Sequence, residues 1–122
     1  MNNDHTYAFE KLRVWQNAKD LVIKIYKLTK NFPDDEKFGL TTQIRRAAIS
    51  VSANIAEGSG RKSSKDQAHF YQISYSSLLE LLNHLYISVE LGFIEPNLFK
   101  ELKSQIFEIT NQLNALHHSI KI

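Results

Sequence analysis

The residues best suited to metal chemistry are two pairs of potential ligands, each set one helical turn apart. Glu80 stands four residues before His84, and Asn114 stands four residues before His118. A di-iron helical bundle requires several inward-facing glutamates and paired Glu-x-x-His motifs, and the chain has neither. It also lacks cysteine, which excludes thiolate ligands and disulfides. The sequence therefore predicts no metal and no other cofactor, with both pairs on a solvated or interface surface.

No other motif indicates catalysis. The sequence Ser59-Gly60-Arg61 resembles part of a phosphate-binding loop, but no strand precedes it and a helix end explains it more simply. No spacing in the chain brings a nucleophile to a base. We therefore expect a protein without enzyme activity and without a small-molecule substrate.

Cationic residues are the second chemical feature of the chain. Residues 1–65 carry 12 Lys and Arg against 7 Asp and Glu, a net charge of +5, whereas residues 66–122 carry 3 against 6, a net charge of −3. Such a division allows a basic surface to bind RNA or DNA. It equally allows the basic part of one copy to face the acidic part of another. A protein–protein scaffold without nucleic-acid binding is the alternative function. The candidate phosphate-binding residues are Arg45, Arg46, Arg61, Lys62 and Lys65.

Three of these cations lie within one central segment, residues 43–61, which has helical periodicity and three rows of side chains. One row is apolar and predicts a helix buried on that side. A second, shorter apolar row on nearly the opposite side suggests a neighbour there as well. The main row contains Ile44, Ala47, Ala48, Val51 and Ile55; the second contains Ile49, Ala53 and Ala56; and a polar seam between them contains Gln43, Arg46, Ser50, Asn54 and Glu57.

We interpret the seam as structural, with a functional role as the alternative. Because an unpaired buried charge is costly, we expect Arg46 and Glu57 to be partly buried and hydrogen-bonded in the assembled protein. Glu57 also lies four residues before Arg61, a favourable spacing for an ion pair. This pair is expected to fix the helix end, or alternatively to hold Arg61 toward a phosphate. Gly58 and Gly60 are candidates for the left-handed conformation that ends a helix.

The rest of the chain predicts helices on both sides of this segment. After a flexible tail at residues 1–8, we expect helices over residues 9–30, 40–57, 65–91 and 96–118. Ser63 or Ser64 is expected to cap the third helix, and Gly92 to end it. Four helices with short links form a single domain over residues 9–122. The predicted fold is all-α, an antiparallel up-down-up-down four-helix bundle.

The third helix carries more apolar surface than one bundle can cover. Tyr75, Leu79 and Tyr86 extend its apolar arc beyond about 100°, the width that a single core requires. Together with the second row of the central helix, they predict a surface for self-association. The fourth helix has one narrow stripe and is expected to contribute less.

The central segment QIRRAAISVSANIAEGSGR also carries a resemblance. With Phe32-Pro33, Phe38-Gly39-Leu40 and Leu78-Leu79-Glu80-Leu81, it resembles the four-helix-bundle family encoded by intervening sequences in bacterial 23S ribosomal RNA genes. The resemblance covers about residues 9–117 and departs at Tyr75-Ser76-Ser77, where a Gly-Ser pair is usual. It implies an antiparallel bundle, a homo-oligomeric ring that is often a pentamer, and no established enzyme activity. It also implies similarity to accessory proteins of diversity-generating retroelements, which bind nucleic acid and a reverse transcriptase.

The location expected from the sequence is the cytoplasm. The first residues are polar, and no apolar run approaches the roughly 18 residues of a membrane span. The absence of cysteine agrees with a reducing compartment. The sequence does not identify a nucleic-acid target or a protein partner.

Overall fold

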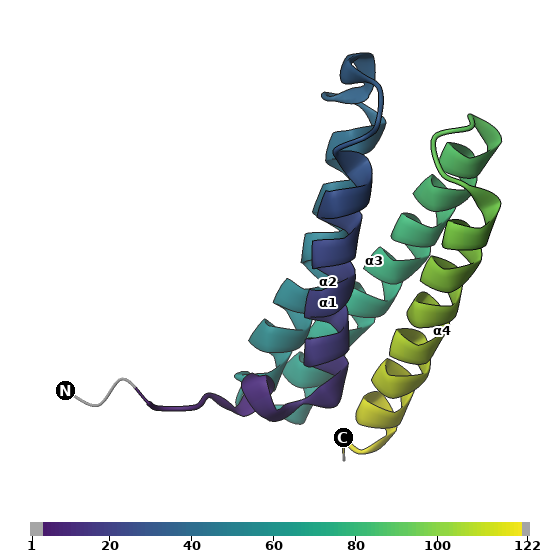
Figure 1. The fold of residues 1–122 in the computed structure, drawn as a ribbon. Coiled ribbons are helices and arrows are strands. Elements are labelled where there is room, and N and C mark those ends of the chain that lie inside the picture. Colours follow the sequence, from purple (N-terminus) through teal and green to yellow (C-terminus); the bar gives the residue numbers. More distant parts are fainter. Residues whose placement is uncertain (1–3, 121–122) are drawn as a thin grey trace.

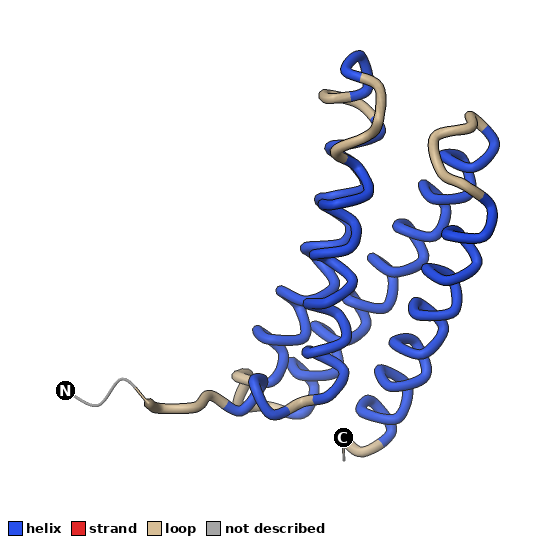
Figure 2. The backbone as a smooth tube through the Cα atoms, in the orientation of Figure 1, coloured by secondary structure: helices blue, strands red, loops and turns tan. Residues whose placement is uncertain are grey.

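The computed structural model describes residues 4–120, and within that range it contains helices and no strand (Figures 1 and 2). The predicted all-α class is therefore confirmed. Two 3₁₀ turns accompany four α-helices. In chain order the elements are η1 (Ala8–Lys11), α1 (Arg13–Thr29), η2 (Asp34–Glu36), α2 (Leu40–Ser59), α3 (Ser64–Glu90) and α4 (Pro96–His118).

Each long helix runs antiparallel to the one before it, so the chain rises, descends, rises and descends (Figure 1). Helix α2 packs against α1 and α3, and α4 packs against α3 and α1. Within the described chain no Cα atom of α2 lies within 8 Å of one of α4, so these helices occupy opposite corners of the bundle. This arrangement confirms the predicted up-down-up-down four-helix bundle. It also places the start of α1, the link between α2 and α3, and the end of α4 at one end of the molecule.

The core is built from the apolar stripes of all four helices. The main row of α2 is buried as predicted, and the stripe of α4 is buried over its central turns. Phe99 of α4 adds an aromatic ring that the narrow predicted stripe did not include. The largest fully buried apolar side chains are Leu21, Ile25, Ile44, Val51, Ile55, Leu78, Leu81, Leu85, Ile109 and Leu113.

The first helix begins later than predicted, because a separate turn precedes it. A carboxylate oxygen of Glu10 accepts a hydrogen bond from the Tyr7 backbone N–H at 2.8 Å and closes the turn η1. Leu12 then adopts extended backbone (φ −77°, ψ 121°), so the helix starts at Arg13 rather than at Phe9. Of the predicted flexible tail, residues 1–3 lie outside the described residues, and the flexibility of the remainder stays a prediction.

The caps of α3 and α4 follow their local sequence chemistry. The Ser63 hydroxyl accepts a hydrogen bond from the Asp66 backbone N–H at 3.1 Å, which satisfies one free donor in the first turn of α3. Pro96 occupies the first turn of α4, where its missing N–H costs nothing. The predicted bounds of α4 are confirmed, and those of α3 differ by one residue at each end.

Gly58 does not end α2 in the left-handed conformation, so that expectation is wrong. Among the described glycines only Gly92 has a positive φ, and α2 continues to Ser59 before Gly60 (φ −93°). Gly58 is instead buried beneath α3, where an added Cβ atom would lie 2.7 Å from the Tyr71 ring and 3.0 Å from Phe70 Cβ. The missing side chain therefore allows α2 and α3 to pack closely. Burial also raises the pKa of the Tyr71 hydroxyl.

Gly92 ends α3 in the left-handed conformation that the sequence suggested, with φ at +80°. The Gly92 N–H donates to the Val89 carbonyl at 2.9 Å, and the Phe93 N–H donates to the Ser88 carbonyl at 2.8 Å. These two bonds form a Schellman motif, which turns the chain toward α4.

We expect Gly92→Ala to destabilise the protein by about 1 kcal/mol, because a Cβ atom disfavours positive φ. No other atom lies within 4 Å of the added carbon, so backbone strain is the only cost. Chemical denaturation measures the change. Gly60→Ala is the matched control because Gly60 already has a negative φ. An equal loss of stability in both variants would show that positive φ at Gly92 is not the cause.

Candidate functional site

The polar seam of α2 divides into a half-buried part and an exposed part. Ser50 and Asn54 lie at the contact with α3: the hydroxyls of Ser50 and Ser77 are 2.8 Å apart, and Asn54 Nδ2 donates to the Ser50 carbonyl at 2.8 Å. The Ser74 hydroxyl donates to the Val51 carbonyl at 2.8 Å in the same contact. These small polar groups satisfy one another's hydrogen bonds at the place where α2 and α3 pack closely.

Arg46 and Glu57 are exposed in the single chain, so the chain alone does not bury them as expected. The Arg46 guanidinium donates a hydrogen bond to the side-chain oxygen of Gln43, one turn earlier on the same helix. These positions face away from the core because the bundle has no further helix on that side of α2. Burial of either residue in an assembly stays a prediction.

Arg45 is a structural residue that fastens α2 to α1. Its Nε donates to the Thr29 hydroxyl at 2.8 Å, and its guanidinium carbon lies 4.6 Å from the centre of the Tyr26 ring. Thr29 is itself buried and donates to the Ile25 carbonyl at 2.8 Å. Arg45 is therefore half-buried and held by two groups of α1, which limits its freedom to reach an external phosphate.

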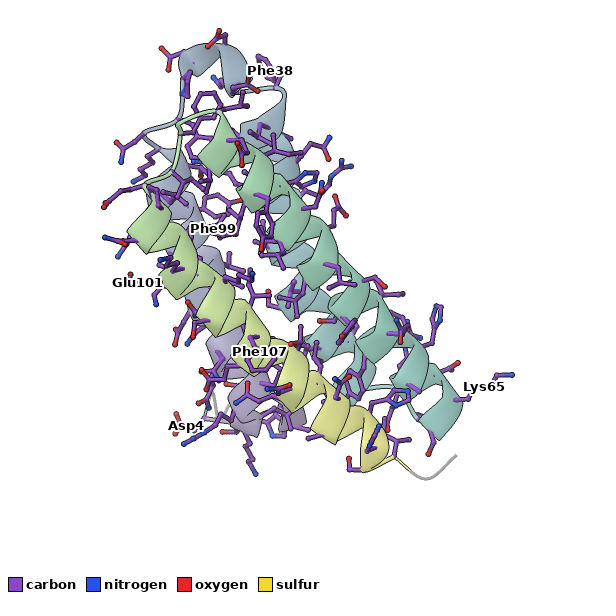
Figure 3. All side chains as sticks on the ribbon, turned by 90° about the vertical axis from the view of Figure 1, so that its right-hand side faces the viewer. Asp4, Phe38, Lys65, Phe99, Glu101 and Phe107 are labelled. Atoms are coloured by element: carbon purple, nitrogen blue, oxygen red, sulfur yellow. The ribbon has the colours of Figure 1, made fainter. Side chains whose placement is uncertain are left out.

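Three predicted cations do lie together, Arg61 and Lys62 in the link between α2 and α3 and Lys65 in the first turn of α3. We call Arg61, Lys62 and Lys65 the link cations; all three are exposed. Because an α-helix rises about 1.5 Å per residue, Arg46 lies on the order of 20 Å from them. Figure 3 shows this separation, with Lys65 at one end of the bundle and Phe38, near the start of α2, at the other. The five predicted cations therefore do not form one site.

Arg61 contacts an aromatic ring rather than the predicted carboxylate. Its guanidinium carbon lies 4.3 Å from the centre of the Phe70 ring, and its carbonyl accepts a hydrogen bond from Gln67 Nε2 at 2.9 Å. No ion pair joins it to Glu57 in the described chain, so the predicted pair is wrong. The Phe70 ring attracts the guanidinium from the first turns of α3, a contact that the spacing within α2 could not indicate.

Two further cations at this end were missed by the sequence reasoning. Lys11 of η1 and Arg13 at the start of α1 are both exposed. The turn η1 packs against α2, and α1 starts at the end of the bundle where α2 finishes (Figure 1). The antiparallel order of α1 and α2 would have indicated this proximity, because it brings the first residues of one beside the last residues of the other.

The predicted apolar surface also divides, into two regions. Ile49 and Ala53 are exposed on the outer side of α2, and Ala56 is half-buried there. Tyr75 and Leu79 instead line a groove of about 400 Å³ between α3 and α4.

Helix α4 also lines this groove. Phe107, labelled on α4 in Figure 3, is 65% exposed and lines it together with Leu79 of α3, which is 51% exposed. Tyr86 is partly covered within the chain, because its ring packs on Phe99 at 4.7 Å and its hydroxyl accepts a hydrogen bond from Lys103. Sequence reasoning missed Phe107 because it lies beside the buried stripe of α4 and not in it.

An acid–histidine pair lies on α3. Glu80 and His84 approach to 3.2 Å, but within residues 4–120 no three His, Asp or Glu side chains come close enough together to hold a metal ion. A groove of about 630 Å³ between α1 and α4 is open and carries charges of both signs, including Asp20, Lys24 and Glu108.

The comparisons with known proteins agree with the fold. The model of a family described as "23S rRNA-intervening sequence protein" matches residues 10–115. A crystal structure from Bacteroides thetaiotaomicron VPI-5482, a protein with unknown function from the S23 ribosomal protein family, is similar at 21% identity and a TM-score of 0.77. The match covers 85% of this chain and 97% of that chain. No curated protein matches the sequence.

At 21% identity the crystal structure supports the fold alone, whereas the family match spans most of the sequence. Among the described helices, none is both long and apolar enough to cross a membrane. The stretch that the family model matches begins in η1 and ends in the last turns of α4, so it includes every helix of the bundle. The chain therefore belongs to the 23S rRNA-intervening sequence protein family.

Proposed function

We propose that this protein is a non-enzymatic nucleic-acid-binding protein that acts as a homo-oligomeric ring of helical bundles. In this proposal the link cations contact phosphate groups of RNA or DNA, and the exposed apolar surfaces hold the copies together. Ribosomal RNA is the first nucleic acid to test, since the family description refers to 23S rRNA. Five copies are the number that the family resemblance favours.

The observation that carries the proposal is that the link cations have no carboxylate partner within the described residues. Arg61, Lys62 and Lys65 are exposed, and none of them forms an ion pair within residues 4–120. Lys11 and Arg13 add two exposed positive charges at the same end of the bundle. Cations with no carboxylate partner attract an external polyanion, and each phosphate contact releases condensed counterions.

Assembly strengthens nucleic-acid binding by a chain that carries only a few cations at its link. A cyclic arrangement turns the same end of every copy toward the same side of the ring. The link cations of all copies then act on one polyanion, and the later contacts form at high effective concentration. A net charge of only +2 per chain is compatible with this mode, because the positive residues gather in the first half of the sequence.

We expect the triple variant Arg61→Ala, Lys62→Ala, Lys65→Ala to bind RNA and DNA more weakly and with less salt dependence. If each cation contacts one phosphate, the slope of log affinity against log salt falls in magnitude by about 2 to 3. Gel shifts across a salt series measure that slope.

A matched control removes the same charge from another part of the bundle. Lys27, Lys30 and Lys100 are exposed and lie toward the opposite end, so replacing all three with alanine should leave the slope nearly unchanged. Equal weakening in the two triple variants would show that only net charge matters and would contradict a site at the link.

A protein–protein scaffold is the second candidate function. The exposed apolar groove between α3 and α4 favours it, because such surfaces commonly mark protein contacts. An assembled protein that binds neither RNA nor DNA at low salt would support the scaffold and exclude the nucleic-acid proposal.

A further inference from the structure

We propose that a pocket at the η2 end of the bundle binds the phosphate group of a small ligand, either inorganic phosphate or a phosphate monoester. The pocket has a volume of about 260 Å³ and lies between the end of α1, η2 and the first turns of α2, remote from the link cations (Figure 1). It does not depend on nucleic-acid binding at the link. We call it the η2 pocket; its polar lining residues are Thr29, Lys30, Asp34, Lys37, Thr41 and Arg45.

The lining of the η2 pocket is positively charged. Lys30, Lys37 and Arg45 stand against one carboxylate, Asp34, which leaves a net charge of +2. Within residues 4–120 none of the three cations forms an ion pair. A phosphate monoester carries about −1.5 to −2 charges at pH 7 and three strong acceptor oxygens, so its charge matches this lining. A ligand with a single carboxylate would leave part of the positive charge uncompensated.

Thr41 supplies a hydroxyl that the chain itself does not use. The residue is only 7% exposed, yet its hydroxyl makes no hydrogen bond within the described chain. No fully buried side-chain oxygen among the described residues lacks a partner, so this hydroxyl must reach the open space of the pocket that Thr41 lines. A nearly buried hydroxyl without a partner costs free energy, and a ligand oxygen that accepts its hydrogen bond removes that cost.

Arg45 offers a guanidinium that is already fixed in place. Its Nε donates to the Thr29 hydroxyl at 2.8 Å, and its Nη2 donates to the Tyr26 carbonyl at 3.5 Å. A guanidinium has further N–H groups beyond these two, and such groups bind phosphate oxygens strongly. Because α1 holds Arg45, the side chain does not extend to a distant phosphate. A small ligand that enters the pocket, however, meets it without further loss of side-chain entropy.

The N-terminus of α2 adds a positive potential beside the η2 pocket. The first turn of a helix favours anions because its N–H groups have no partner within the helix. One carboxylate is already present, since Glu36 Oε1 accepts a hydrogen bond from the Leu40 N–H at 3.2 Å. The N–H groups of Thr41 and Thr42 have no acceptor within residues 4–120. Glu36 therefore leaves donors of this turn available.

The enclosure of the η2 pocket favours a small ligand over a polymer. Its volume is below about 300 Å³, the lower end of the range for small-molecule pockets. Thr29, Phe32 and Thr41 are buried lining residues, and the Phe32 ring packs on Phe93 at 5.4 Å, so these walls are parts of the packed bundle. The link cations are all exposed, an arrangement that suits the outer backbone of a polymer instead.

Titration of the unaltered full chain with inorganic phosphate tests the proposal. We expect saturable binding by calorimetry, and amide NMR shifts at Thr41, Thr42 and Arg45 but not at the link cations. Adenosine monophosphate and adenosine then identify the source of the phosphate. Binding of inorganic phosphate alone indicates the free ion, whereas binding of the monophosphate as well indicates a phosphate carried by a larger molecule. Adenosine should not bind.

Variants of Thr41 test the hydroxyl. Thr41→Val removes it and nearly keeps the shape of the side chain, and the fold loses no hydrogen bond because the hydroxyl has no partner in the described chain. We expect phosphate affinity to fall by about tenfold or more, since a hydrogen bond to a charged group is lost. Thr41→Ser keeps a hydroxyl and should retain most of the affinity. Circular dichroism checks that each variant folds.

A pair of lysine variants tests the charge. Lys30→Gln with Lys37→Gln should weaken phosphate binding by about tenfold or more. Lys27→Gln with Lys100→Gln removes the same charge from exposed positions that do not line the pocket, and should change the affinity by less than about twofold.

Several results would overturn the proposal. A dissociation constant above about 10 mM for phosphate and for adenosine monophosphate would exclude a specific site. Amide shifts confined to the link, equal weakening by the two lysine pairs, or unchanged binding by folded Thr41→Val would each contradict the η2 pocket. If Thr41→Val does not fold, the shifts in the unaltered protein and the lysine pairs still decide. None of these results bears on RNA binding at the link, which the gel shifts measure separately.

Discussion

Leu79→Glu is expected to convert the assembled protein into single chains of 14.1 kDa. Leu79 is 51% exposed and lines the α3–α4 groove, so a partner that fills the groove must cover this position. Covering a carboxylate placed there removes its hydration water, at an effective cost of several kcal/mol. Since about 1.4 kcal/mol corresponds to a tenfold change in affinity, each contact should weaken by more than about a hundredfold.

Ile23→Glu is the matched control for this prediction. Ile23 is 50% exposed, almost the same as Leu79, but it lies on α1 beside the open groove with α4. The control should keep the native mass, because Ile23 lies outside the apolar surfaces of α2, α3 and α4 that are proposed to hold the copies together. Light scattering of both variants gives the comparison. Loss of assembly in both, or retention in the Leu79 variant, would contradict the assignment of the groove.

Gly58→Leu is expected to destabilise the folded protein by about 3 kcal/mol or more, because the contact between α2 and α3 has no room for a side chain. An added Cβ alone would lie 2.7 Å from Tyr71 Cε1 and 3.0 Å from Phe70 Cβ. The Tyr71 ring is buried and Phe70 Cβ is fixed to the backbone, so neither can move away without separating the helices. Leucine adds three further carbon atoms. The helical preference of leucine over glycine recovers only about 1 kcal/mol.

Gly60→Leu separates packing from backbone effects. Gly60 is exposed two residues later, and the nearest atom to an added Cβ is the Glu57 carbonyl oxygen at 3.7 Å, an ordinary contact. This variant should lose less than about 1 kcal/mol. Urea denaturation followed by circular dichroism measures both changes. A Gly58 variant as stable as the Gly60 variant would show that α2 and α3 do not require the glycine.

The parts of the fold that the sequence predicted well depend on neighbouring residues in the chain. Ser63 caps α3 through the backbone of Asp66, three residues later, and Pro96 starts α4 by its own ring geometry. Gly92 ends α3 through bonds to Val89 and Ser88. Each of these signals acts over a few residues, so single-sequence reasoning can find it.

The features that the sequence did not predict depend on residues from other helices. Gly58 was read as a helix end, but Tyr71 and Phe70 of α3 explain its presence. Arg45 was grouped with the other cations, although Thr29 of α1 holds it. Such contacts follow from the packing of helix pairs, which periodicity within one helix does not specify.

The sequence indicates which residues are candidates for the site, but it does not indicate which of them lie together in the fold. The link cations are adjacent in sequence and remain together in the fold, whereas Arg46 stands at the other end of α2. Phe107 joins the groove only because α4 packs against α3 with Leu79 on the facing side. The position of Phe107 next to the buried stripe of α4 gave no indication of that neighbour.

The mass of the unaltered protein in solution shows whether this chain functions as an assembly of copies. Static light scattering at micromolar concentration gives that mass directly. We expect a stable particle of several chains, with a mass that is a multiple of 14.1 kDa, and five copies according to the family resemblance. A soluble, folded protein that stays at 14.1 kDa over the whole concentration range would contradict it.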